Sequence, residues 1–84
     1  VVVSSTAYNT ERPDVIVMAV TSQARPENRL DIPVRDWQQA KLLKPSVVKP
    51  VIATIEQVLV IKHLGRLSEQ DRRVLLEQMR GLLG

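Results

Sequence analysis

The chain has no cysteine, few aromatic residues and few glycines. Without cysteine there is no disulfide, no thiolate metal ligand and no cysteine nucleophile. One Tyr, one Trp and no Phe are too few for an aromatic platform that stacks bases. Three glycines do not provide a glycine-rich phosphate loop. These absences exclude several classes of enzyme and of nucleic-acid-binding domain.

Clusters of catalytic or metal-binding residues are also missing from the sequence. His63 is the only histidine, which excludes a mechanism that uses two histidines. A lone histidine between Lys62 and Leu64 is more typical of a strand than of a metal site, because such sites need several ligands. No HExxH motif and no paired aspartates occur. We therefore expect no metal and no cofactor.

Length and charge place the chain among small basic domains. Its 84 residues are enough for one domain with a small core, and 44% of them are hydrophobic. The net charge is +3, which is compatible with a nucleic-acid partner but is more typical of an ordinary basic surface. No signal peptide and no transmembrane span is recognisable. We expect a cytoplasmic protein without a membrane partner.

The most informative stretch is residues 14–28, DVIVMAVTSQARPEN. The apolar run at 15–20 predicts a strand that is buried on both faces. Thr21, Ser22 and Gln23 then place two hydroxyls and an amide at the C-terminal end of this strand. A rigid strand that delivers polar groups into a loop is a common way to build a site.

The remaining segments predict further strands with one short helix. Polar and apolar residues alternate at 29–34, which predicts an edge strand because Pro33 cannot donate a hydrogen bond. Asp36 is a suitable N-cap for a helix at 37–42. Further expected elements are a strand at 1–3, a loop at 6–13, a strand at 46–55 with a bend at Pro50, and a strand at 58–64.

A C-terminal helix at 68–83 is the clearest prediction. Ser68 is a suitable N-cap, and Glu69 and Asp71 favour the positive end of the helix dipole. The apolar residues share one helical face: Leu75, Leu76, Met79, Leu82 and Leu83. The residues alone thus predict a small, basic, mostly β domain with a C-terminal helix.

Three blocks of sequence resemble the PemK/MazF family of toxin endoribonucleases. They are VVVSSTAYN continuing through RPDVIVMAVTSQARP, then VRDWQQAKLLKPSVVKPVIATI, then LGRLSEQDRRVLLEQM. The resemblance implies an SH3-like small β-barrel of the MazF, PemK and CcdB type with a C-terminal α-helix, acting as a homodimer. It further implies a type II toxin that cuts single-stranded mRNA without a metal, through the ribose 2′-hydroxyl, and that binds a cognate antitoxin.

The same resemblance assigns roles to individual residues. Thr21 matches the family's catalytic threonine and would donate its hydroxyl to a phosphate oxygen; a local hydrogen bond to the backbone is the alternative interpretation. The family's arginine would fall just upstream of Val1. We therefore expect residues 1–84 to be one domain that is truncated at its N-terminus and not active by itself. The candidate RNA-binding residues are Ser22, Gln23, Arg25, Lys49 and Thr54. Among the cations, Arg25, Lys49 and also Lys62 are candidates for contacts to phosphate.

A non-catalytic role is the alternative hypothesis. The domain could bind only an antitoxin, or it could bind DNA gyrase, as related toxin barrels do. A cleavage assay on single-stranded RNA in the presence of EDTA distinguishes these classes.

Overall fold

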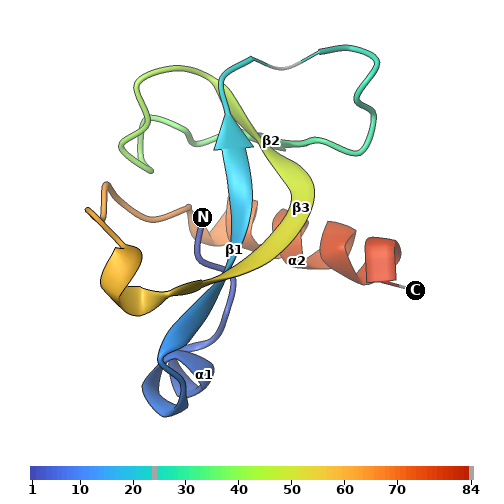
Figure 1. Ribbon diagram of the computed structural model, residues 1–84. Coiled ribbons are helices and arrows are strands. Elements are labelled where there is room, and N and C mark those ends of the chain that lie inside the picture. Colours follow the sequence, from blue (N-terminus) through green and yellow to red (C-terminus); the bar gives the residue numbers. More distant parts are fainter. Residues whose placement is uncertain (24, 84) are drawn as a thin grey trace.

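A computed structural model describes residues 1–23 and 25–83 (Figure 1). Its elements in chain order are α1 (Thr6–Glu11), β1 (Asp14–Thr21), β2 (Ile32–Val34), β3 (Ser46–Glu56), the 3₁₀ helix η1 (Gln57–Leu59) and α2 (Glu69–Leu83). Ala24 in the predicted polar loop and Gly84 at the end of the predicted domain lie outside the described residues. No helix in the described ranges is long and apolar enough to cross a membrane.

In the described part of the chain, the three strands form one antiparallel sheet with the order β1-β3-β2. β3 lies in the centre because its eleven residues are long enough to pair with both neighbours. Val48 makes this plain, since it pairs with Val20 of β1 and with Ile32 of β2. On the outer edge of β1, Val2 forms a bridge to Val17, so the predicted N-terminal strand is present as a single bridge.

The pairing of β1 with β3 is interrupted at one place. Met18 pairs with Ile52 and Val20 pairs with Val48, so that Ala19 faces the three residues 49–51. Pro50 lies inside this bulge, where it need not donate a hydrogen bond to the ladder. The predicted bend at Pro50 is confirmed.

The core lies between the sheet and α2, which crosses behind the strands in Figure 1. Ser68 begins this helix as predicted, because its Oγ accepts a hydrogen bond from the Asp71 backbone nitrogen at 3.1 Å. Leu75 is the helical residue in the central cluster, whereas Leu76 and Leu83 remain exposed. The members of the cluster are Met18, Ile32, Val34, Val48 and Leu75.

The predicted fold class is confirmed, since an antiparallel sheet and a C-terminal helix form a small compact unit. The burial predicted for β1 holds only in part. Val15 and Met18 are buried, but Ala19 and Val20 are exposed. The end of β1 that leads to Thr21 therefore opens towards solvent.

The prediction of a loop at 6–13 is wrong, because α1 forms there. Ser5 caps this helix by accepting a hydrogen bond from the Tyr8 backbone nitrogen at 3.1 Å. Gln57 then holds the helix end, since its Nε2 donates to the carbonyl oxygens of Asn9 at 2.7 Å and Arg12 at 2.8 Å. This contact across the chain offsets the weak helix preference of Asn and Thr.

The helix predicted after Asp36 is also wrong, because the chain makes only one helical turn. The Ala40 nitrogen donates to the Asp36 carbonyl oxygen at 3.1 Å, and the Leu42 nitrogen donates to the Trp37 carbonyl oxygen at 3.0 Å. The second bond spans five residues and belongs to a Schellman motif, which ends a helix. Lys41 occupies the left-handed position of this motif, with φ at 66°.

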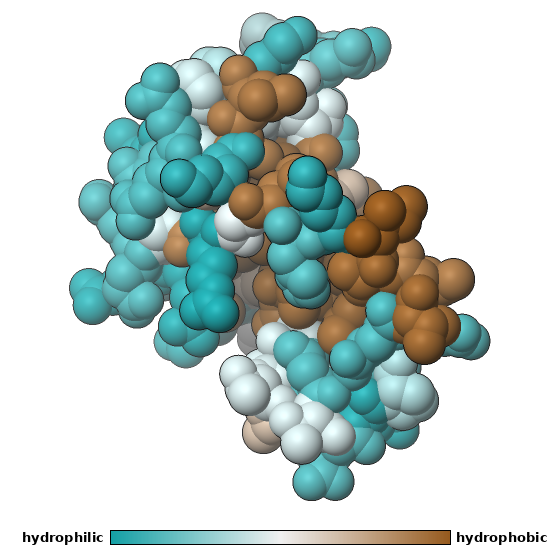
Figure 2. Space-filling view, turned by 90° about the vertical axis from the view of Figure 1, so that its left-hand side faces the viewer, coloured by the Kyte–Doolittle hydropathy of each residue, from teal (hydrophilic) through white to brown (hydrophobic). Residues whose placement is uncertain are grey.

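Two predicted strands are shortened or absent. Of residues 29–34, only Ile32–Val34 pair in the sheet, because the backbone turns where the Asp31 nitrogen donates to the Asn28 carbonyl oxygen. Residues 58–64 were predicted as a strand, but η1 and an irregular segment replace it, and no described strand pairs with them. Figure 2 shows hydrophobic surface on the side where η1 lies, and Val58 and Ile61 are strongly exposed.

Candidate functional site

Thr21 lies at the C-terminal end of β1, where the sheet opens to solvent. It is half-buried and pairs with Val47 of β3. Its Oγ1 accepts a hydrogen bond from the Gln23 backbone nitrogen at 3.1 Å. The local bond that was the alternative interpretation is therefore present, but it uses the oxygen as an acceptor. The hydroxyl is held in place by the turn, and its hydrogen remains available for donation.

A hollow of about 690 Å³ opens beside Thr21. Three separate parts of the chain line it: the end of β1, the loop before β3, and the segment that leads to α2. The lining residues are Val20, Thr21, Ser22, Lys41, Leu42, Leu43, Lys44, Ser46, Lys62 and Leu64. The hollow combines hydroxyl groups, apolar side chains and cations.

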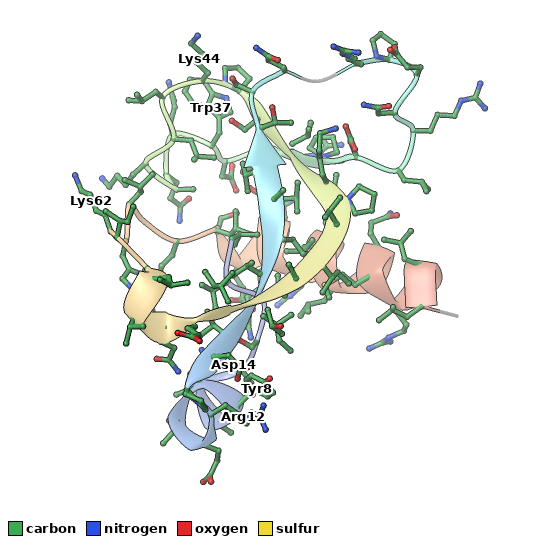
Figure 3. All side chains as sticks on the ribbon, viewed as in Figure 1. Tyr8, Arg12, Asp14, Trp37, Lys44 and Lys62 are labelled. Atoms are coloured by element: carbon green, nitrogen blue, oxygen red, sulfur yellow. The ribbon has the colours of Figure 1, made fainter. Side chains whose placement is uncertain are left out.

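The charge of this hollow is entirely positive in the described chain. Lys41, Lys44 and Lys62 line it, whereas no Asp or Glu does. Within the described ranges, none of the three lysines takes part in an ion pair. In Figure 3, Lys44 and Lys62 extend outward from different segments of the chain. Ammonium groups of this kind attract phosphate groups.

Asp71 fixes the loop that carries Lys41 and Lys44. Its side chain is buried, with 4% of its surface exposed, in the first turn of α2. The carboxylate accepts hydrogen bonds from the backbone nitrogens of Arg35 at 3.1 Å and Asp36 at 2.8 Å. These bonds tie the start of the loop to α2, which itself packs on the core.

Gly65 joins the same loop to the segment that carries Lys62. A Cβ atom at Gly65 would overlap the Ala40 carbonyl oxygen and would lie 2.8 Å from Lys41 Cγ. Only glycine allows this close approach. Lys41 itself adopts a left-handed backbone, which costs a residue with a side chain about 1–3 kcal/mol. The loop before β3 and the segment before α2 are therefore closely packed where they meet at the hollow.

The family model described as PemK-like, MazF-like toxin of type II toxin-antitoxin system matches residues 1–83. This chain belongs to the PemK/MazF family. Among solved structures, the Mycobacterium tuberculosis toxin MazF-mt6 is similar, with a TM-score of 0.81, 20% sequence identity, and coverage of 98% of this chain and 81% of that chain. No curated protein sequence gives a match. The predicted family is confirmed, and the PemK/MazF toxin has a MazF-type fold.

The residues predicted for RNA binding in this PemK/MazF toxin divide into two groups. Ser22 and Lys62 line the hollow together with Thr21. Gln23 is exposed and follows Ser22 directly, and Arg25 is exposed in the loop beyond. The roles of all these residues remain predictions.

Lys49 and Thr54 lie away from the hollow of the PemK/MazF toxin. Lys49 lines another hollow, of about 470 Å³, and its Nζ lies 3.4 Å from an oxygen of Asp31, whose side chain is 8% exposed. Thr54 pairs with Ile16. Ile16 and Thr21 are five residues apart on β1, so they occupy opposite faces about 17 Å apart along the strand. Thr54 is therefore not brought close to Thr21.

Sequence reasoning missed two of the three lysines and the residue that fixes their loop. Lys41 and Lys44 were placed in or beside a predicted helix, and Asp71 was assigned to the helix dipole. A sequence signal does exist for the lysines, since they flank two leucines just before Pro45. Nothing local indicates that Asp71 binds the backbone of residues 35 and 36.

A second polar group lies at the other end of β1. The Arg12 Nε is 3.2 Å from Asp14 Oδ1, and the Tyr8 hydroxyl donates to the same oxygen at 3.3 Å (Figure 3). The hydrogen bond from Arg12 is the main cause that lowers the pKa of Asp14. Arg12 is thus engaged at the end of the strand remote from Thr21. In the described residues, no three His, Asp or Glu side chains could together hold a metal ion.

Proposed function

We propose that this PemK/MazF toxin is a metal-independent endoribonuclease that cleaves single-stranded mRNA at specific sequences. The observation that carries the proposal is that Thr21 lines a hollow together with three lysines and no described acid. Such a hollow suits an anionic chain, and its hydroxyl donor is held by a turn. Membership of the PemK/MazF family supports RNA as the type of substrate.

The reaction uses a nucleophile that RNA itself provides. The ribose 2′-oxygen forms a bond to the adjoining phosphorus and loses its proton to a base, while the 5′-oxygen leaves and takes up a proton. Negative charge builds on the two non-bridging phosphate oxygens. We assign to Thr21 a hydrogen bond to one of these oxygens, because its hydrogen is not used by the local turn. The internal nucleophile needs no metal-bound water.

The register of the N-terminal residues supports the expected position of the family's arginine. The Val3 nitrogen donates to the Ile16 carbonyl oxygen and the Met18 nitrogen donates to the Val1 carbonyl oxygen, each at 2.8 Å. In this antiparallel register, a residue directly before Val1 would stand opposite Ala19. Ala19 and Thr21 share a face, so that residue would be a diagonal neighbour of Thr21, roughly 7–8 Å away and within reach of a long side chain.

We further propose a homodimer and an antitoxin with an acidic, flexible segment as the protein partners. Hydrophobic side chains that are strongly exposed, such as Val58 and Ile61, support association with another chain. The cationic hollow supports the acidic segment. Sedimentation at high micromolar concentration should give a dimer; a monomer would contradict that part of the proposal.

The test is cleavage of a single-stranded RNA by the complete protein in the presence of EDTA, with an all-deoxy strand of the same sequence as control. We expect the RNA to be cut and the DNA to remain intact. Thr21→Val should lower the rate on the order of 10²-fold, and Thr21→Ser should retain most of it, because serine keeps the donor. Loss of cleavage in EDTA with recovery in Mg²⁺, or full activity of folded Thr21→Val, would contradict the mechanism. RNA binding without cleavage would favour the non-catalytic alternative.

A further inference from the structure

We propose that Lys41, Lys44 and Lys62 form a phosphate-binding track that holds the RNA strand beside the scissile phosphate at Thr21. The inference deepens the proposed endoribonuclease function and rests on it. It assigns to Lys41 and Lys44 a role that was not predicted from the sequence, and it groups Lys62 with them. The proposed ligand is the phosphate backbone of a single RNA strand, which the lysines contact whatever its base sequence.

The charge arrangement favours phosphates over other ligands. All three lysines are exposed and line one hollow, and within the described chain none has an acidic partner. Lys49 offers the contrast, because Asp31 already neutralises it. The three cations come from two segments that both line the hollow, so together they can contact more than one phosphate of a strand. Thr21 and Ser22, which carry hydroxyl groups, line the same hollow, and hydroxyl donors also suit phosphate oxygens.

The backbone of Lys41 is the second observation. Lys41 occupies the left-handed position that ends a Schellman motif, where glycine is the unstrained residue. A strained residue at a site points to a use for its side chain. The Lys41 side chain is exposed, so burial of its stem does not explain its presence. Lys41 lines a hollow without described acids, so its ammonium group gives the lysine a use that glycine cannot supply.

Gly65 and Asp71 hold the backbone segments that carry the lysines. Gly65 packs against Ala40 and Lys41 closely enough to exclude a Cβ atom, and so fixes the Lys62 segment to the Lys41 turn. Asp71 holds the start of the loop through two backbone hydrogen bonds. A track of fixed cations loses less entropy on binding than mobile lysines do.

The experiment measures binding of a 2′-O-methyl RNA strand by fluorescence anisotropy at several salt concentrations. This probe cannot undergo attack by a 2′-hydroxyl, so binding is separated from cleavage. For single strands, the logarithm of the binding constant falls with the logarithm of the salt concentration, and the slope is about 0.7 for each phosphate contact. We expect the slope to fall by about 2 in the variant with Lys41→Gln, Lys44→Gln and Lys62→Gln, and by about 0.7 in each single variant. Arg73→Gln, an exposed cation on α2, is the matched control and should leave the slope unchanged.

Lys41→Gly separates a role in binding from a role in folding. It removes the charge and relieves the backbone, so the melting temperature should stay the same or rise while the salt slope falls by about 0.7. A Lys41→Gly slope equal to that of the unaltered protein would overturn the assignment of Lys41. An unchanged slope in the triple variant of a protein that still cleaves RNA would overturn the track and leave the endoribonuclease function standing. A fall in slope, with no cleavage of RNA by the complete protein, would support the track and contradict the enzyme. If the triple variant loses binding to an acidic peptide but keeps its binding to RNA, the track would be overturned in favour of a protein partner.

Discussion

Replacing Asp71 by alanine should both destabilise the fold and loosen the lysine loop. The carboxylate is buried and accepts hydrogen bonds from the backbone nitrogens of Arg35 at 3.1 Å and Asp36 at 2.8 Å. A hydrogen bond to a charged group contributes about 1.5–3 kcal/mol. Water can reach the exposed residue Arg35 in the variant, so we take the lower value for each bond and expect a loss of about 3 kcal/mol in the free energy of unfolding.

For a domain of this size, each kcal/mol corresponds to about 4–8 °C in melting temperature, so Asp71→Ala should lower it by roughly 12–24 °C. Thermal unfolding followed by circular dichroism measures this directly. Glu69→Gln is the matched control, because Glu69 lies in the same helical turn but is exposed. Glu69 shares the interaction with the helix dipole and lacks the backbone contacts, so Glu69→Gln should lower the melting temperature much less. Equal shifts in the two variants would show that Asp71 acts only through the dipole and would refute the reasoning.

Two other predictions concern Gly65 and the pair of Arg12 with Asp14. Gly65→Ala should destabilise by about 1–3 kcal/mol, since its Cβ would meet the Ala40 carbonyl oxygen. At Gly81 an added Cβ would meet nothing within 4 Å, so Gly81→Ala should stabilise α2 by about 0.5–1 kcal/mol. A fall of the urea midpoint in both variants would contradict this contrast. Because Arg12 lowers the pKa of Asp14, the pair contributes stability above pH 3.8, and this is lost as the pH falls through the lower folded pKa. In Arg12→Gln, an NMR titration should show the Asp14 pKa closer to 3.8; an unchanged pKa would contradict the assigned cause.

The sequence predicts the elements whose signal is local and long. The apolar run before Thr21, the strand around Pro50 and the leucine-rich helix after Ser68 all appear where expected. The shorter elements depend on distant contacts. α1 needs Gln57 from beyond β3, and no pattern within 6–13 reveals that partner. Residues 58–64 have strand-like composition but no neighbouring strand in the described chain, so no ladder forms.

The candidate site was predicted in part, from the polar end of a predicted strand and from the family resemblance. Thr21 and Ser22 follow a predicted strand, so their position at its end could be read from the sequence. The hollow itself could not, because it brings together residues near 21, 41 and 62 from three segments. Their meeting depends on the Asp71 contacts and the close approach at Gly65, both of which are tertiary. Lys49 and Thr54 were predicted as RNA contacts within the family resemblance, but Lys49 lines another hollow and the strand register separates Thr54 from the site.

The central claim is that the 2′-hydroxyl of RNA attacks a phosphate held at Thr21. The most direct test is to map one cleavage position and analyse the ends of the two products made in the presence of EDTA. Attack by the 2′-oxygen predicts a 2′,3′-cyclic phosphate on one product and a free 5′-hydroxyl on the other, and a single 2′-deoxyribose at the mapped position should stop cleavage there. Products with a 3′-hydroxyl and a 5′-phosphate, or undiminished cleavage of the deoxy-substituted strand, would contradict the account.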